Sequence, residues 1–111
     1  MKDLLPLFQA LSDPTRLAIV ERLATEGEVG AGALHEDFDM SASAVSQHLK
    51  VLRDAGVIVQ RSQGQARLYT LEKRAVQRVK DWAIDHESFW NDSFDRLGAA
   101  LDETGEFGDL K

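Results

Sequence analysis

The spacing of apolar residues changes along this 111-residue chain, and these changes constrain its fold more than any other feature. Up to about residue 55 the apolar residues recur every three or four positions, which predicts helices. Residues 57–61 and 67–71 are β-branched or alternating runs, and Gly64 lies between them, as in a β-hairpin. Helical spacing returns from residue 72. A helix-turn-helix followed at once by a hairpin predicts a winged-helix fold, mainly α with a small β-hairpin (α+β).

Local signals predict where the helices before the hairpin begin and end. Asp13 is a good N-cap, and Pro14 suits the first helical position. Ser41 is the expected N-cap of a later helix, and Gly56 is its expected C′ residue. These signals predict helices at about residues 4–11, 14–26, 31–37 and 42–55, with a short strand at Val29.

Residues 72–103 are predicted to form one long last helix. Its apolar and aromatic residues fall at steps of three and four from Val76 to Leu101, which makes one continuous stripe. A lone helix cannot hide such a stripe, so we expect a dimer interface there. An apolar ligand pocket lined by Trp82, Phe89 and Trp90 is the alternative. We therefore predict a single domain over residues 1–111, with a DNA-binding core at about 4–71, a dimerisation helix at 72–103 and a flexible tail at 104–111.

Charge is distributed unevenly along the chain. The formal net charge is −6, but residues 41–80 contain eight basic and only two acidic residues. A basic segment inside an acidic chain is the electrostatic footprint expected for phosphate binding. The negative net charge of the whole chain slightly favours an alternative interpretation, in which the protein is a protein-interaction module that has kept the fold and lost DNA binding.

The helix predicted to begin after Ser41 has a polar face with no acidic residue. At 3.6 residues per turn, Ser46, Gln47 and Lys50 fall within roughly 60° of Ser43, and the apolar residues cluster on the opposite side. Serines allow a close approach to a groove, Gln47 can pair with adenine, and Lys50 can reach guanine or phosphate. We predict that this is a recognition helix; an ordinary amphipathic surface helix is the alternative.

Residues beyond this face complete the predicted interface. The N-terminus of the helix at Ser41 and the side chain of Arg53 are expected to meet backbone phosphates, and the hairpin tip is expected to form the wing. The predicted DNA-binding set is Ser41, Ser43, Ser46, Gln47, Lys50, Arg53, Arg61, Gln63, Gly64 and Arg67. The predicted dimer interface is Leu4, Leu7, Phe8, Val79, Trp82, His86, Phe89, Trp90, Phe94 and Leu97.

Two runs of sequence resemble the ArsR family of winged-helix repressors. They are ALSDPTRLAI at residues 10–19 and SAVSQHLKVLRDAG at residues 43–56, and Tyr69 near the end of the second hairpin strand also fits. The resemblance covers about residues 4–71. It implies a homodimer, joined through its first and last helices, that binds an inverted-repeat operator in or near its own promoter and represses transcription.

The resemblance also implies a metal switch in typical members, and this chain departs from their pattern. Family metal ligands are cysteines near the recognition helix or Asp, His and Glu residues on the last helix. The chain has no cysteine, and its last helix has a single histidine. We therefore expect a branch of the family without a cysteine metal site and no metal ligand. A zinc site shared across a dimer, from Asp85, His86, Glu87 and Asp92, remains an alternative.

Other classes of protein are excluded or disfavoured by what the sequence lacks. The absence of cysteine excludes disulfides. The sequence has no Gly-x-Ser-x-Gly elbow, no Walker loop and no plausible pair of catalytic carboxylates, so we expect neither an enzyme nor a cofactor. No apolar run approaches the roughly 20 residues of a membrane span, and the N-terminus lacks a signal-peptide pattern, so we expect a cytoplasmic protein.

Overall fold

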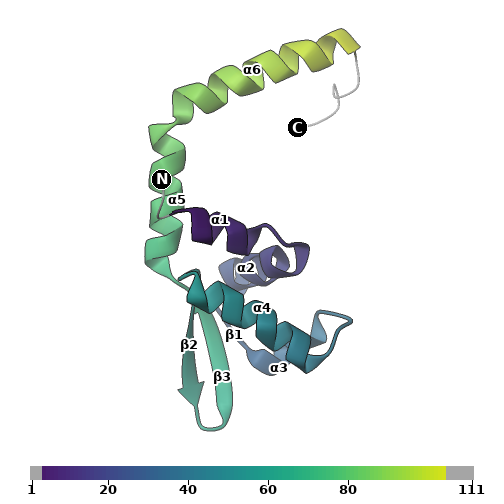
Figure 1. Cartoon of the computed structure of the whole chain (residues 1–111), viewed down its shortest axis with the longest axis vertical. Helices are drawn as coiled ribbons and strands as arrows, with labels where there is room; N and C mark the ends of the chain where they lie inside the picture. The colour runs from purple at the N-terminus through teal and green to yellow at the C-terminus, as the bar shows by residue number, and fades with distance from the viewer. Residues whose placement is uncertain (1–3, 105–111) are drawn as a thin grey trace. The chain divides into compact units, whose positions relative to one another are not determined.

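The computed structural model describes residues 4–104, which divide into two units, one up to Val79 and one from Lys80. The elements follow the chain in the order shown in Figure 1: α1 (Leu5–Leu11), α2 (Pro14–Glu26), β1 (Glu28–Gly30), α3 (Ala31–Glu36), α4 (Ala42–Asp54), β2 (Ile58–Gln63), β3 (Ala66–Leu71), α5 (Lys73–Asp85) and α6 (Glu87–Thr104).

Both predicted N-caps form in the first unit. The Asp13 carboxylate accepts a hydrogen bond from the backbone N–H of Arg16 (3.0 Å), and Pro14 follows at the start of α2. The Ser41 hydroxyl accepts one from the N–H of Ala44 (3.1 Å) at the start of α4. Each cap satisfies a backbone donor that has no partner within the helix, which fixes where α2 and α4 begin.

The end of α4 is a Schellman motif centred on Gly56. Gly56 has a φ of +76°, a conformation that side chains disfavour. Its N–H donates to the carbonyl of Arg53 (3.0 Å), and the N–H of Val57 donates to the carbonyl of Leu52 (2.9 Å). The predicted C′ role of Gly56 is confirmed, and the turn leads directly into β2.

The sheet has three antiparallel strands in the order β1-β3-β2. The expected strand at Val29 is β1, and Val29 pairs with Tyr69 of β3. Pairing of β2 and β3 continues as far as Gln63 and Ala66, so the hairpin is longer than predicted and its turn is only two residues. Gly64, the first turn residue, has a φ of +62°, as this kind of tight turn requires.

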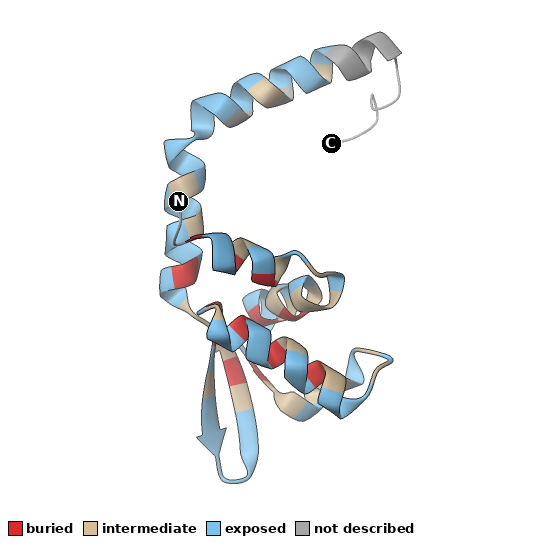
Figure 2. Cartoon of the chain, in the orientation of Figure 1, coloured by how far each residue is buried: buried red, intermediate tan, exposed pale blue. Residues whose placement is uncertain are grey.

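The core of this unit is built from the apolar faces of its helices and one face of the sheet. Helices α1, α2 and α4 pack on one another, α2 also packs on β3, and α4 on β2. Figure 2 shows the buried positions of α4 along one side of the helix and exposed positions along the other. The most deeply buried large side chains are Ile19, Leu23, Leu34, Val45 and Leu52.

The predicted single last helix is wrong, because two helices, α5 and α6, meet at His86. The backbone N–H of His86 lies between the carbonyls of Trp82 (3.2 Å) and Ala83 (3.3 Å), a pattern common at helix ends. The ring Nδ1 of His86 is also 2.8 Å from the Trp82 carbonyl oxygen. The Trp82 carbonyl is thus shared between the backbone and the side chain of His86 at the point where α5 ends.

The expected apolar stripe is therefore not carried by one helix. Ile84 and Leu97 are each 55% exposed and Phe89 is 57% exposed, so apolar surface remains uncovered on both helices. The side chains of Trp90 and Phe94, and the tail beyond residue 104, lie outside the described residues. No helix within residues 4–104 is long and apolar enough to cross a membrane.

Candidate nucleic-acid interface

The polar face of α4 is fully available to a partner. Ser43, Ser46, Gln47 and Lys50 are all exposed, whereas Val45, Leu49 and Leu52 on the other side are buried. The other predicted DNA-binding residues are exposed too: Ser41, Arg53, Arg61, Gln63, Gly64 and Arg67. The two sides of α4 thus divide as the helical wheel predicts, and the N-terminal end of α4, where the helix dipole favours anions, is also at the surface.

Two basic residues of α4 have partners that the sequence did not reveal. The Lys50 ammonium lies 2.8 Å from the Asp54 carboxylate one turn away, and this contact lowers the pKa of Asp54. The prediction of a face with no acidic residue is therefore wrong, because the exposed Asp54 lies beside Lys50. The Arg53 guanidinium donates to the side-chain oxygen of Gln60 (2.7 Å), which also accepts from the Tyr69 hydroxyl (2.9 Å). Gln60 therefore links the last turn of α4 to both hairpin strands, and it holds the wing in register with the recognition helix.

Arg61 is bound by an acidic residue from the opposite edge of the sheet. Its guanidinium makes two hydrogen bonds to the Glu28 carboxylate, at 2.6 and 2.7 Å. The pair lowers the pKa of Glu28 and raises the pKa of Arg61. This bidentate geometry is the favoured one for arginine and carboxylate. Arg61 therefore has a competing partner for any phosphate it meets, and sequence spacing gave no signal of it because Glu28 is 33 residues away.

Arg67 lies on the opposite face of the hairpin from Arg61. Side chains alternate between the two faces of a strand, so Arg67 shares a face with Tyr69, and Arg61 lies on the other face from Gln60. Gln60 bonds Arg53 of α4, so the Gln60 and Tyr69 face is the one turned to the recognition helix. Within residues 4–104 no charged or hydrogen-bonding partner holds the Arg67 guanidinium.

A cluster around Arg16 anchors α4 to the start of α2. The Arg16 Nε donates to the carbonyl of Ala10 (2.6 Å), and its Nη1 lies 3.4 Å from Nδ1 of His48 on α4. The same His48 nitrogen is 3.8 Å from the Asp13 carboxylate. Residues 10–16 of the motif at 10–19 therefore hold the recognition helix on its core side through His48. The sequence resemblance alone does not indicate this structural role.

A second arginine fixes the first helix of the helix-turn-helix. Arg22 on α2 donates to the carbonyl of Ala33 (2.9 Å) and to the carboxylate of Asp37, at the end of α3. His35 on α3 has its Nε2 3.0 Å from the carbonyl oxygen of Met40 in the turn. These contacts tie α2, α3 and the turn together just before α4 begins.

Asp13 makes folding of this unit sensitive to acid. The hydrogen bond from the Arg16 N–H keeps the pKa of Asp13 below its usual value, and the charge of His48 lowers this pKa further. The stabilisation is present above the unfolded-state pKa of about 3.9 and is lost as the pH falls through the lower folded-state pKa.

Asp13→Asn keeps a capping side chain but cannot ionise. We expect urea midpoints of the wild type to fall more steeply than those of Asp13→Asn between about pH 5 and pH 2; equal slopes would contradict this role.

The described residues hold no group of three or more His, Asp or Glu side chains placed to bind one metal ion. Asp85, His86, Glu87 and Asp92 lie around the break between α5 and α6. The Nδ1 of His86 already faces the Trp82 carbonyl, and the His86 ring lies against the Trp82 ring with centroids 4.9 Å apart. A site shared between two copies stays untested.

Comparison with known proteins agrees with this architecture. Residues 11–61 match a helix-turn-helix domain family model. The chain is 38% identical over 99 residues to the HTH-type transcriptional regulator Rv2034 of Mycobacterium tuberculosis, covering 89% of each chain. It is 35% identical over 79 residues to the transcriptional repressor SdpR of Bacillus subtilis, covering 71% of this chain and 87% of SdpR.

Solved structures resemble the chain as well. A crystal structure of an ArsR family transcriptional regulator superposes with a TM-score of 0.71 at 33% identity, covering 81% of this chain and 92% of the other. A possible transcriptional regulator for arsenical resistance gives a TM-score of 0.69 at 37% identity, covering 83% and 92%. The winged helix-turn-helix predicted from the sequence is confirmed, and the chain belongs to the ArsR family of DNA-binding transcriptional regulators.

Proposed function

We propose that the protein is a cytoplasmic, autoregulatory repressor that binds an inverted-repeat operator as a homodimer. The observation that carries the proposal is the exposed polar face of α4, which is formed by Ser43, Ser46, Gln47 and Lys50 on a helix that Ser41 caps and that the wing follows. A similar protein from Bacillus subtilis is named a transcriptional repressor, which supports the direction of regulation.

Each group of exposed residues has its own role in this proposal. Ser43, Ser46, Gln47 and Lys50 face the base edges of the major groove, where glutamine and lysine can distinguish base pairs. Ser41 and Arg53 lie at the two ends of α4 and meet backbone phosphates. The hairpin residues Arg61, Gln63, Gly64 and Arg67 form the wing, which contacts the adjacent backbone or minor groove.

The dimer in this proposal uses α1 and the helices after the hairpin. Phe8, Val79 and Trp82 are half-buried, and His86, Phe89 and Leu97 are exposed. A partner copy could therefore bury accessible surface of these residues in an interface. Leu4 and Leu7 are only 7% and 2% exposed, so they already belong to the core of their own chain. Sedimentation velocity should give a dimer at micromolar concentration, and a monomer at all concentrations would contradict this part of the proposal.

The two wing arginines should contribute unequally to DNA binding. Arg67 has no competing partner among the described residues, whereas a phosphate must displace Glu28 to bind Arg61. We expect Arg67→Ala to weaken operator binding about tenfold and to lower the slope of log affinity against log salt by about one unit for each copy. Arg61→Ala is the matched control and should cost less than about threefold. A larger loss for Arg61→Ala would reverse the assignment.

The function itself is tested on DNA from the protein's own promoter. Gel-shift titrations should give a discrete complex whose affinity falls steeply between about 50 and 200 mM salt, because phosphate contacts release counterions. Neither EDTA nor added zinc should change the affinity, since we propose a metal-independent repressor. The absence of a complex on this and other promoter fragments, together with a stable complex with another protein, would favour an interaction module instead.

A further inference from the structure

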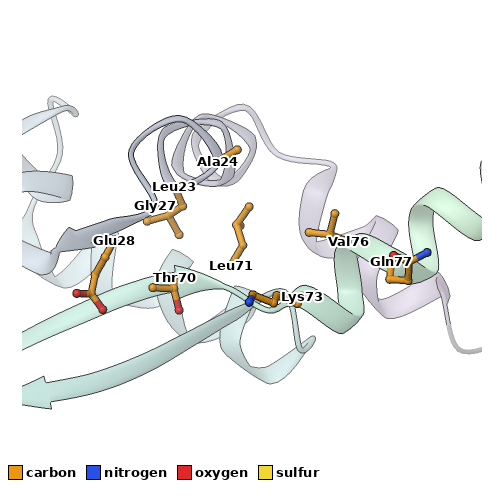
Figure 3. Close-up of a pocket in the computed structure, with 9 residues that line it drawn as sticks. All are labelled: Leu23, Ala24, Gly27, Glu28, Thr70, Leu71, Lys73, Val76 and Gln77. Atoms are coloured by element: carbon orange, nitrogen blue, oxygen red, sulfur yellow. The ribbon is translucent and has the colours of Figure 1, made fainter.

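A groove in the first unit is not used by the proposed DNA contacts. It has a volume of about 770 Å³ and lies between the end of α2, the end of β3 and the first turns of α5. Figure 3 shows Leu71 of β3 standing between the α2 residues Leu23 and Ala24 and Val76 of α5. Known small-molecule sites have volumes of about 300–1,000 Å³, so the groove is large enough for a small ligand.

The groove is apolar where its walls are closest. Leu23 forms part of its base and is almost completely buried, at 1% exposed. Val76 is 51% exposed, Ala24 is also exposed, and Leu71 is half-buried. Apolar side chains from α2, β3 and α5 therefore line the groove and keep solvent-accessible surface. A bound hydrocarbon group would remove this apolar surface from water.

One positive charge in the groove is uncompensated. Lys73 lines the groove at the start of α5, and within residues 4–104 no carboxylate or other partner holds its ammonium group. Glu28 is the acidic residue of the lining, and the two hydrogen bonds from Arg61 neutralise its charge. Figure 3 shows the Lys73 side chain extended with its nitrogen on the side of Thr70. An anionic group is the complement of this end of the groove.

We propose that this groove binds an amphipathic monocarboxylate, with its carboxylate at Lys73 and its hydrocarbon portion on Leu23, Leu71 and Val76. The charge pattern selects this ligand over its alternatives. A neutral alcohol leaves Lys73 without a counterion, and an alkylamine places a second positive charge beside it. The site lies outside the recognition helix and the hairpin tip, so this inference goes beyond DNA binding and can fail without affecting it.

Decanoate, kept below its micelle concentration, tests the site directly in the absence of DNA. Titration into the full-length protein should shift the methyl resonances of Leu71 and Val76 in a saturable way, with Ile84 and Leu97 as methyl controls. Affinity should rise up to about fourfold for each methylene from hexanoate to decanoate while the chain is still being buried. Decylamine should bind at least tenfold more weakly than decanoate.

Lys73→Met is the decisive variant, and Lys80→Met on the same helix is its matched control. Lys73→Met should weaken decanoate binding about fivefold to tenfold and leave decanol binding unchanged, whereas Lys80→Met should change neither. The proposal is overturned if decanoate gives no saturable shift, if decylamine binds equally well, or if Lys73→Met has no effect. It is also overturned if Val76→Glu converts a dimer to a monomer, because a second copy of the chain would then cover the groove.

Discussion

Replacing Gln47 and Lys50 together with alanine should reduce the affinity for promoter DNA by about 100-fold or more. A good side-chain contact to a base edge is worth about 1–3 kcal/mol, and a homodimer loses the contacts of both copies. Loss of Lys50 also leaves Asp54, its partner at 2.8 Å, as an uncompensated carboxylate near the phosphates. Fluorescence anisotropy with a labelled promoter fragment measures the effect.

The matched control for this double variant is Gln9→Ala with Lys80→Ala. It removes the same two kinds of side chain from exposed helical positions outside α4. We expect its affinity for the promoter to stay within about threefold of the wild type, since scattered surface charges contribute little beyond the general electrostatic term. Equal losses in the two double variants would mean that charge alone, and not the face of α4, determines binding.

Leu52→Ala should be the most destabilising of the single substitutions considered for the first unit. Leu52 is fully buried on the inner side of α4, at 0% exposed, and its carbonyl also accepts the N–H of Val57 after the helix. Truncation of a buried leucine to alanine costs about 2–5 kcal/mol, because it removes apolar contacts and leaves a cavity. Small domains have about 5–15 kcal/mol of total stability, so a large part of it would be lost.

Urea unfolding followed by circular dichroism measures this loss, and Val51→Ala is the control on the same helix. Val51 is 39% exposed, so its truncation should cost less than about 1 kcal/mol. Leu52→Ala should also lower the affinity for DNA in proportion to the fraction unfolded, and excess protein should restore binding. A midpoint for Leu52→Ala equal to that of Val51→Ala would contradict the described core.

Most of the fold followed from local chemistry in the sequence. The N-caps Asp13 and Ser41 and the C′ residue Gly56 each act through backbone groups within three or four residues, so their positions could be predicted without tertiary information. The two sides of α4 were also predictable, because burial follows helical periodicity.

Most of the features that the sequence did not predict depend on contacts outside the apolar periodicity of helices and strands. The break at His86 coincides with a side-chain contact to the Trp82 carbonyl, which apolar spacing cannot detect. The Glu28–Arg61 pair joins residues 33 positions apart, across the central strand of the sheet. Gln60 bonds both Arg53 and Tyr69 and so connects the wing to the recognition helix, which its place in a strand does not indicate.

We expect the exposed face of α4 to enter the major groove of operator DNA. The chain has no cysteine, so Ala42→Cys provides a single attachment point for iron–EDTA at the N-terminal end of α4, and Thr25→Cys provides one on α2. We expect cleavage of promoter DNA from position 42 within two half-sites about one helical turn apart, and far less cleavage from position 25. Strong cleavage from position 25, with none from position 42 in a protein that still binds, would contradict this expectation.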